Sequence, residues 1–126
     1  MSESQLVLEG SSGSWRLGGA GAGVLDLPNA YLGYLQDRNY SPRTIRTYGY
    51  GLLAFFRWLA RTGVRLEEVD TDTVLAFLSS CRHERVTGRP GPNVLDLQGN
   101  RVDRLTATSI NLRLAAVSGM FEYRSM

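Results

Sequence analysis

A serine–proline pair that opens a basic, aromatic-rich stretch is the feature that most constrains this chain. Ser41 is a favourable N-cap, and Pro42 suits the first helical position, where its missing N–H leaves no hydrogen bond unmade. Gly63 is a natural residue just past a helix end. The sequence therefore predicts a long helix over residues 42–62.

This predicted helix has two different faces. At ~100° per residue, one narrow sector holds Tyr50 and four arginines, which are Arg43, Arg46, Arg57 and Arg61. The opposite sector is apolar, with Ile45, Tyr48, Leu52, Phe55, Phe56 and Leu59. The apolar face is expected to bury against a core. The arginine face suits the phosphate backbone of a nucleic acid, which guanidinium groups bind bidentately, although a basic helix face can also simply be solvated.

Positive charge is concentrated in the part of the chain that is expected to fold. The formal net charge is only +2, but residues 38–126 carry thirteen of the fourteen basic residues against eight acidic ones. All fourteen basic residues are arginine. This distribution favours a polyanionic partner over a neutral one.

Several classes of function have no support in the sequence. The single cysteine, Cys81, cannot form an internal disulfide, which fits a reducing cytoplasm, and its position on an apolar helix side indicates packing. His83 is the only histidine, and no metal-ligand spacing surrounds it. We therefore expect no metal, cofactor, small-molecule substrate or membrane partner, and a small enzyme is the least favoured class.

The chain is expected to divide into a tail and one folded domain. Residues 1–24 are rich in glycine and serine, which predicts a flexible tail, and only residues 6–8 have the composition of a short strand. Residues 25–126 are long enough for one domain with a core. Within it, helical periodicity and capping residues predict four helices, over residues 28–38, 42–62, 71–82 and 107–124.

The connection between the third and fourth predicted helices is too long to be a plain loop. Residues 94–97 and 101–105 alternate in polarity around a glycine-containing turn, so either a small β-hairpin or an ordered loop is expected there. The connection carries four arginines that could reach along DNA, namely Arg85, Arg89, Arg101 and Arg104.

Four segments in order resemble the N-terminal core-binding domain of tyrosine recombinases, the phage-integrase family. They are the Ser-Pro-x-Thr start of residues 41–48 with its aromatic continuation, residues 66–69, the Phe77–Leu78 pair, and residues 109–117 followed by Phe121. Leu112 departs from the usual arginine of the last motif. The resemblance covers residues 25–126.

The resemblance implies an all-α fold, a four-helix SAM-like orthogonal bundle that forms half of a clamp on double-stranded DNA at a recombination half-site. Strand cleavage in this family belongs to a separate C-terminal domain, so this chain is expected to be a fragment that does not catalyse recombination. The lysine that such a domain supplies is missing, and Val86 stands where an arginine would follow His83. Other recombinase protomers are the expected protein partners, in a bacterial or phage-encoded cytoplasmic protein.

The expected DNA contacts come from the second predicted helix and from the start of the fourth. Polar side chains and free N–H groups at a helix start suit phosphates or base edges. The candidates are Arg43, Thr44, Arg46, Thr47, Arg57, Arg61, Thr106, Thr108, Ser109, Asn111 and Arg113. Arg57 and Arg61 have the alternative of a solvated face, and Arg113 that of a structural salt bridge. The competing function is a helical protein-interaction module, whose binding should be less sensitive to salt.

Overall fold

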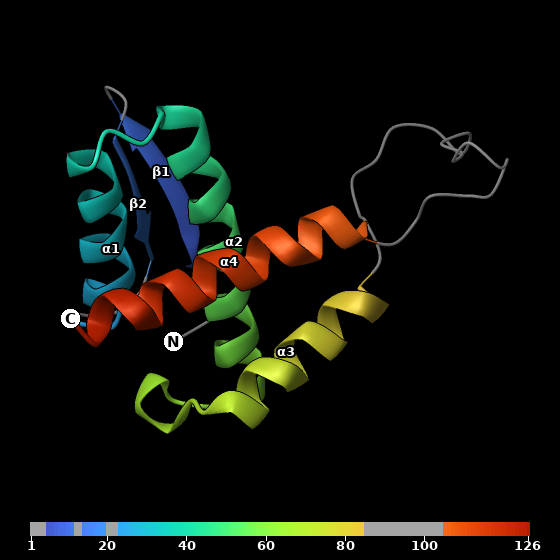
Figure 1. Cartoon of the computed structure of the whole chain (residues 1–126). Coiled ribbons are helices and arrows are strands. Elements are labelled where there is room, and N and C mark those ends of the chain that lie inside the picture. Colours follow the sequence, from blue (N-terminus) through green and yellow to red (C-terminus); the bar gives the residue numbers. More distant parts are fainter. Residues whose placement is uncertain (1–4, 12–13, 20–22, 85–104) are drawn as a thin grey trace, which may run out of the picture.

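The computed structural model describes residues 5–11, 14–19, 23–84 and 105–126. Two strands, β1 (Val7–Ser11) and β2 (Ser14–Gly18), come first along the chain. Four α-helices follow, with a short 3₁₀ helix, η2 (Leu66–Glu68), between the second and third (Figure 1). The helices are α1 (Asp26–Asp37), α2 (Pro42–Thr62), α3 (Thr71–His83) and α4 (Ala107–Arg124).

The predicted helix ends are confirmed wherever a capping residue marks them. The Ser41 hydroxyl oxygen accepts from the Thr44 N–H at 3.1 Å, and Gly63 ends α2 with a left-handed φ of 76°. Asp70 caps α3 by accepting from the Thr73 N–H at 2.9 Å. Thr106 caps α4 in the same way. Each cap satisfies an N–H group that a helix start leaves without a backbone partner.

The prediction of a flexible tail over residues 1–24 is wrong for the β-hairpin that β1 and β2 form. The two strands pair antiparallel, with Leu8 opposite Leu17 and Gly10 opposite Trp15. Leu6 is 0 % exposed and Leu17 1 % exposed, so both belong to the hydrophobic core. The fold is therefore mostly helical with a small two-stranded sheet, and not all-α as the sequence predicted.

Polar contacts from two helices hold the hairpin in place. The Asn29 side chain on α1 accepts from the Leu17 N–H at 2.7 Å and donates to the Leu17 carbonyl at 3.0 Å. On the other side, the Arg57 guanidinium on α2 donates to the Leu6 carbonyl at 2.7 Å. The backbone of β2 and the residue before β1 are therefore bound by helix side chains.

Helix α2 is the centre of the molecule, with the hairpin on one side and α4 on the other (Figure 1). Gly49 faces Leu8 of the hairpin, and Gly51, two residues later, faces Ala116 of α4. A side chain at Gly51 would place its Cβ 3.1 Å from the Cβ of Ala116. The two helices therefore cross at a contact between small residues.

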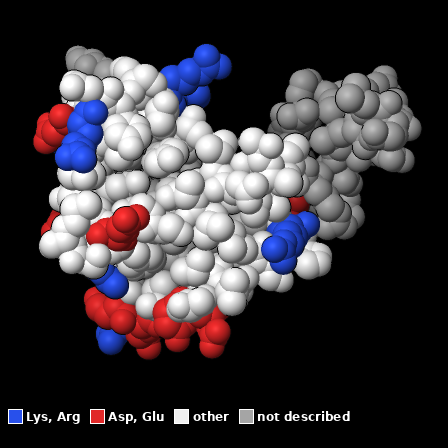
Figure 2. Space-filling model, in the orientation of Figure 1, with Lys and Arg blue, Asp and Glu red and all other residues white. Residues whose placement is uncertain are grey.

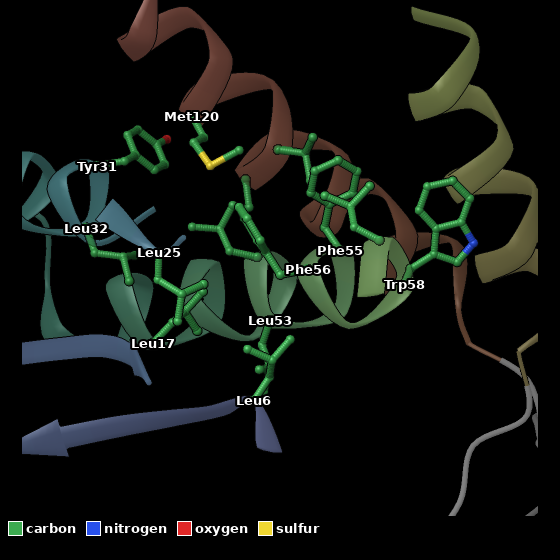
Figure 3. Packing of buried hydrophobic residues seen from close by; sticks show 14 of the residues in the cluster. Leu6, Leu17, Leu25, Tyr31, Leu32, Leu53, Phe55, Phe56, Trp58 and Met120 are labelled. Carbon is green, nitrogen blue, oxygen red and sulfur yellow. The ribbon is translucent and has the colours of Figure 1, made fainter. Parts of the chain in front are cut away.

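The core lies along the apolar face of α2 predicted from the sequence. Phe55, Phe56 and Leu52 are at most 2 % exposed. Figure 3 shows Trp58 of α2 beside α3, Met120 of α4 beside Tyr31, and Leu6 against Leu53. Among the described residues, no helix has the length and apolar character to cross a membrane.

Candidate nucleic-acid interface

A groove between α2 and the start of α4 brings together residues from both predicted contact groups. It has a volume of about 320 Å³. Thr47 and Arg57 line it from α2, and Ser109 and Arg113 line it from α4. The remaining lining residues are Tyr50, Gly51, Leu53, Ala54, Leu105 and Leu112. The crossing of α2 and α4 at Gly51 thus places two separated sequence segments on one surface.

The first turn of α4 places polar groups at this groove, of which Ser109 lines it. Thr106 is the N-cap, and its hydroxyl accepts from the Ser109 N–H at 3.1 Å while donating to the Ser109 hydroxyl. Thr108 and Asn111 are exposed. The N–H groups of a first turn and the helix dipole both favour an anion at this position.

The N-terminal half of α2 carries two exposed arginines that do not themselves line the groove. Arg43 and Arg46 are both exposed. Thr44 belongs to the helix cap, since its N–H and hydroxyl both bond the Ser41 hydroxyl, and Thr47 donates its hydroxyl to the Arg43 carbonyl. The two threonines therefore shape the helix start, and the two arginines remain available to a ligand.

The other two residues of the predicted arginine face, Arg57 and Arg61, lie in different surroundings. Arg57 is half-buried, because its guanidinium holds the Leu6 carbonyl of the hairpin. Arg61 lies in the last turn of α2, close enough to Cys81 of α3 for its charge to act on the thiol. The four arginines of the predicted arginine face therefore differ in their surroundings: Arg43 and Arg46 are exposed, and the other two lie against the hairpin and near α3.

Arg113 has the structural salt bridge that the sequence left as an alternative. Its guanidinium binds the Glu84 carboxylate with two hydrogen bonds, of 3.0 and 3.1 Å, and donates to the Cys81 sulfur at 3.4 Å. Burial acts to lower the pKa of Arg113, but these bonds outweigh burial and raise it. Arg113 thus connects α4 to the end of α3. Only the exposed part of the Arg113 side chain lines the groove.

Cys81 is a packing residue, as the sequence indicates. It is 1 % exposed, and burial raises the pKa of its thiol despite the nearby Arg113. A buried thiol with a raised pKa is a poor nucleophile. The described residues also contain no group of three or more His, Cys, Asp or Glu side chains that could hold a metal ion.

Negative charge collects away from the groove. Glu67, Glu68, Asp70 and Asp72 are exposed on η2 and the start of α3. Figure 2 shows acidic residues gathered at the lower edge of the molecule, below a largely uncharged surface over α4. A polyanion approaching the molecule is therefore repelled at this edge and attracted at the opposite end of α2.

A second groove, between α3 and α4, is mainly apolar and has a volume of about 450 Å³. Leu75, which is 57 % exposed, lies at this groove. Its other apolar lining residues are Val69, Val74, Leu78, Leu114, Val117 and Phe121. This groove is therefore an apolar surface that is partly open to solvent.

Four of the predicted contact residues lie outside the described residues. They are Arg85, Arg89, Arg101 and Arg104, and the possible hairpin of residues 94–105 falls in the same segment except for its last residue.

Sequence reasoning missed Trp15, which lies in the segment interpreted as a linker. The Arg46 guanidinium stands 5.7 Å from the Trp15 ring centroid and 5.1 Å from that of Tyr50. The available signal was strand-like alternation on both sides of a Gly/Ser turn, with Leu6 and Leu8 before the turn and Trp15 and Leu17 after it.

Comparison with known proteins finds a family match for about half of the chain. Residues 29–90 match the family model of the phage integrase N-terminal SAM-like domain. The matched segment belongs to this family. It contains nearly all of α1, then α2, η2 and α3, whereas the hairpin and α4 lie outside it.

Two relatives of the SAM-like domain are copies of transposase A from transposon Tn554, in two strains of Staphylococcus aureus. Each is 27 % identical over 95 residues, which is 75 % of this chain and 25 % of the transposase. The chain thus spans about a quarter of the length of these relatives. No solved structure matches the chain. The integrase domain and the transposase relatives together support a recombination-related role.

Proposed function

We propose that this chain binds double-stranded DNA at a recombination half-site, through the face formed by the starts of α2 and α4. The observation that carries the proposal is the groove where the start of α4 meets the middle of α2, with the exposed Arg43 and Arg46 closer to the start of α2. The membership of residues 29–90 in an integrase domain family supports it.

The physical basis is the match between this face and a phosphate backbone. Arginine binds phosphate bidentately, and a helix start presents N–H groups to a second phosphate. Asn111 and Thr108 are exposed on α4, where they can approach base edges in a groove of the duplex. We propose Arg43, Arg46, Thr108 and Asn111 as direct contacts, with Arg57 and Arg113 acting mainly within the protein.

Fluorescence anisotropy with a labelled duplex, measured over a series of salt concentrations, tests the proposal. We expect binding that weakens steeply as salt rises, because each phosphate neutralised releases counterions. Arg43→Ala and Arg46→Ala should each weaken binding and lower the slope of log affinity against log salt by about one. Arg124→Ala, at the far end of α4, is the control with the same change in charge.

Binding that is indifferent to both Arg43→Ala and Arg46→Ala would exclude this face. Equal losses from Arg43→Ala, Arg46→Ala and Arg124→Ala would indicate attraction by net charge alone, without a defined interface.

We propose in addition that this segment does not cleave DNA and acts beside a catalytic domain and other recombinase protomers. The matched family is the N-terminal domain of integrases, and the sequence offers no set of residues for bond chemistry. Incubation with supercoiled plasmid tests this, since any nicked or relaxed product formed by the purified chain would overturn it.

The second candidate is a helical protein-interaction module, favoured by the apolar groove between α3 and α4. Such binding would change little with salt, because apolar burial does not release counterions. Leu75→Asp would abolish it and leave DNA binding intact, whereas Arg46→Ala would do the reverse.

A further inference from the structure

The hairpin does more than fill the core, because its one tryptophan reaches the basic half of α2. Strand β1 runs alongside α2, with the Leu6 carbonyl at Arg57, Leu8 at Gly49, and the Gly10–Trp15 pair nearest Arg46. Trp15 is half-buried and Tyr50 is 47 % exposed. The guanidinium of Arg46 stands near both rings, one from each element.

The position of the Trp15 ring depends on the residue across the strand. Gly10 pairs with Trp15, and a Cβ at Gly10 would lie 2.5 Å from the ring, closer than any contact allows. The ring therefore covers the backbone at Gly10 and extends toward α2. Only glycine at position 10 permits this placement.

We propose that Trp15 and Tyr50 are positioning residues that hold the Arg46 guanidinium ready to bind a DNA phosphate. The inference rests on the proposed function and deepens it by assigning the hairpin a part in the interface. Stacking uses the faces of a guanidinium and leaves its edge N–H groups directed outward, where a phosphate binds them. An arginine that is already ordered loses less side-chain entropy on binding, so affinity rises without a further contact.

A double-mutant cycle measures whether Trp15 acts through Arg46. Trp15→Ala should weaken binding to a duplex about 2- to 5-fold, the range expected for an exposed cation–π contact. The salt slope should not change, because no phosphate contact is removed. In an Arg46→Ala background, Trp15→Ala should have no further effect, while in an Arg43→Ala background its effect should persist in full.

Three further variants separate positioning from loss of structure. Trp15→Phe keeps an aromatic ring and should restore most of the affinity. Gly10→Ala displaces the Trp15 ring without removing any ring or charge, and should weaken binding as Trp15→Ala does. Tyr50→Ala changes the cluster from α2 and leaves the hairpin untouched, so its effect should also vanish in the Arg46→Ala background. Circular dichroism and thermal melting establish that each variant is folded.

The outcomes distinguish this inference from the proposed function. If Arg43→Ala and Arg46→Ala weaken binding, but Trp15→Ala and Tyr50→Ala add their full effects to Arg46→Ala, the positioning role is wrong and the DNA face stands. If neither arginine variant changes binding, the DNA face itself is wrong. Should Trp15→Ala unfold the hairpin, Tyr50→Ala and Trp15→Phe decide the question alone.

Discussion

Arginine side chains on one face of a helix differ in role because different elements pack beside them. Arg43 and Arg46 remain exposed, while Arg57 bonds a carbonyl 51 residues away in sequence. Arg113, on α4, is held by Glu84. Helical periodicity assigns a residue to a face but gives no information about its distant partners, so each arginine needs its own test.

Arg113→Ala should lower stability and leave the salt dependence of DNA binding unchanged. Its side chain is only 18 % exposed, and its removal leaves the Glu84 carboxylate without both hydrogen bonds. We expect a loss of about 1–3 kcal/mol in the free energy of unfolding, measured by urea denaturation. Arg113→Lys should recover only part of it, because an ammonium group cannot form the bidentate pair. A reduced salt slope for Arg113→Ala would instead indicate a phosphate contact.

Tyr31 should make the protein sensitive to alkaline pH. Its side chain is 5 % exposed, and burial, with smaller contributions from neighbouring tyrosines and Glu122, raises its pKa from 10.0 to about 12. The unfolded chain therefore loses this proton first, so stability is retained below pH 10 and falls between pH 10 and pH 12. Tyr31→Phe should decline less over this range, as followed by circular dichroism. Parallel pH profiles for the two proteins would contradict the assignment.

At the scale of elements, the hairpin should contribute to stability as a core element does. Leu17→Ala removes a side chain that is 1 % exposed and should lower the free energy of unfolding by about 2–5 kcal/mol. Val7→Ala, in the paired strand but 41 % exposed, is the control and should change it by less than about 0.5 kcal/mol. Chemical denaturation measures both, and equal small effects would mean that the hairpin packs only loosely.

The crossing of α2 and α4 should tolerate no bulk at Gly51. Gly51→Val must displace the Ala116 Cβ and the Arg113 Cα, which lie 3.1 and 3.3 Å from an ideal Cβ at this position. Such overpacking costs about 1–3 kcal/mol. Gly33→Ala in α1 has no atom within 4 Å of the new Cβ and should raise stability by about 0.5–1 kcal/mol. Thermal melting of the two variants should therefore shift in opposite directions.

The helices could be predicted from the sequence because their signals are local. Ser41, Asp70 and Thr106 each act within three residues of their own position, so capping and periodicity together define the helix starts. The hairpin could not be predicted in this way, since its stability depends on Asn29 and Arg57 contacting its backbone from other elements. The same limit applies to the candidate site: local signals predict where α2 and α4 begin, but they do not predict that the Trp15 ring lies near Arg46.

On the scale of the whole molecule, charge of opposite sign lies at opposite ends. The acidic residues of η2 and α3 lie at one end, and Arg43 and Arg46 lie at the opposite end of α2 (Figures 1 and 2). A net charge of +2 conceals this asymmetry. A duplex bound at the α2–α4 groove would therefore lie far from the acidic edge.

The double variant Glu67→Gln/Glu68→Gln tests whether this geometry governs binding. Both side chains are largely exposed and pair with Arg65, so their neutralisation should leave the fold intact. The net charge rises by two, which should accelerate association modestly at low salt through the overall field. The salt slope should stay unchanged, because it counts phosphates in contact and no contact is added. Restoring wild-type affinity to Arg43→Ala/Arg46→Ala by this double variant at physiological salt would show that total charge, and not the groove, determines binding.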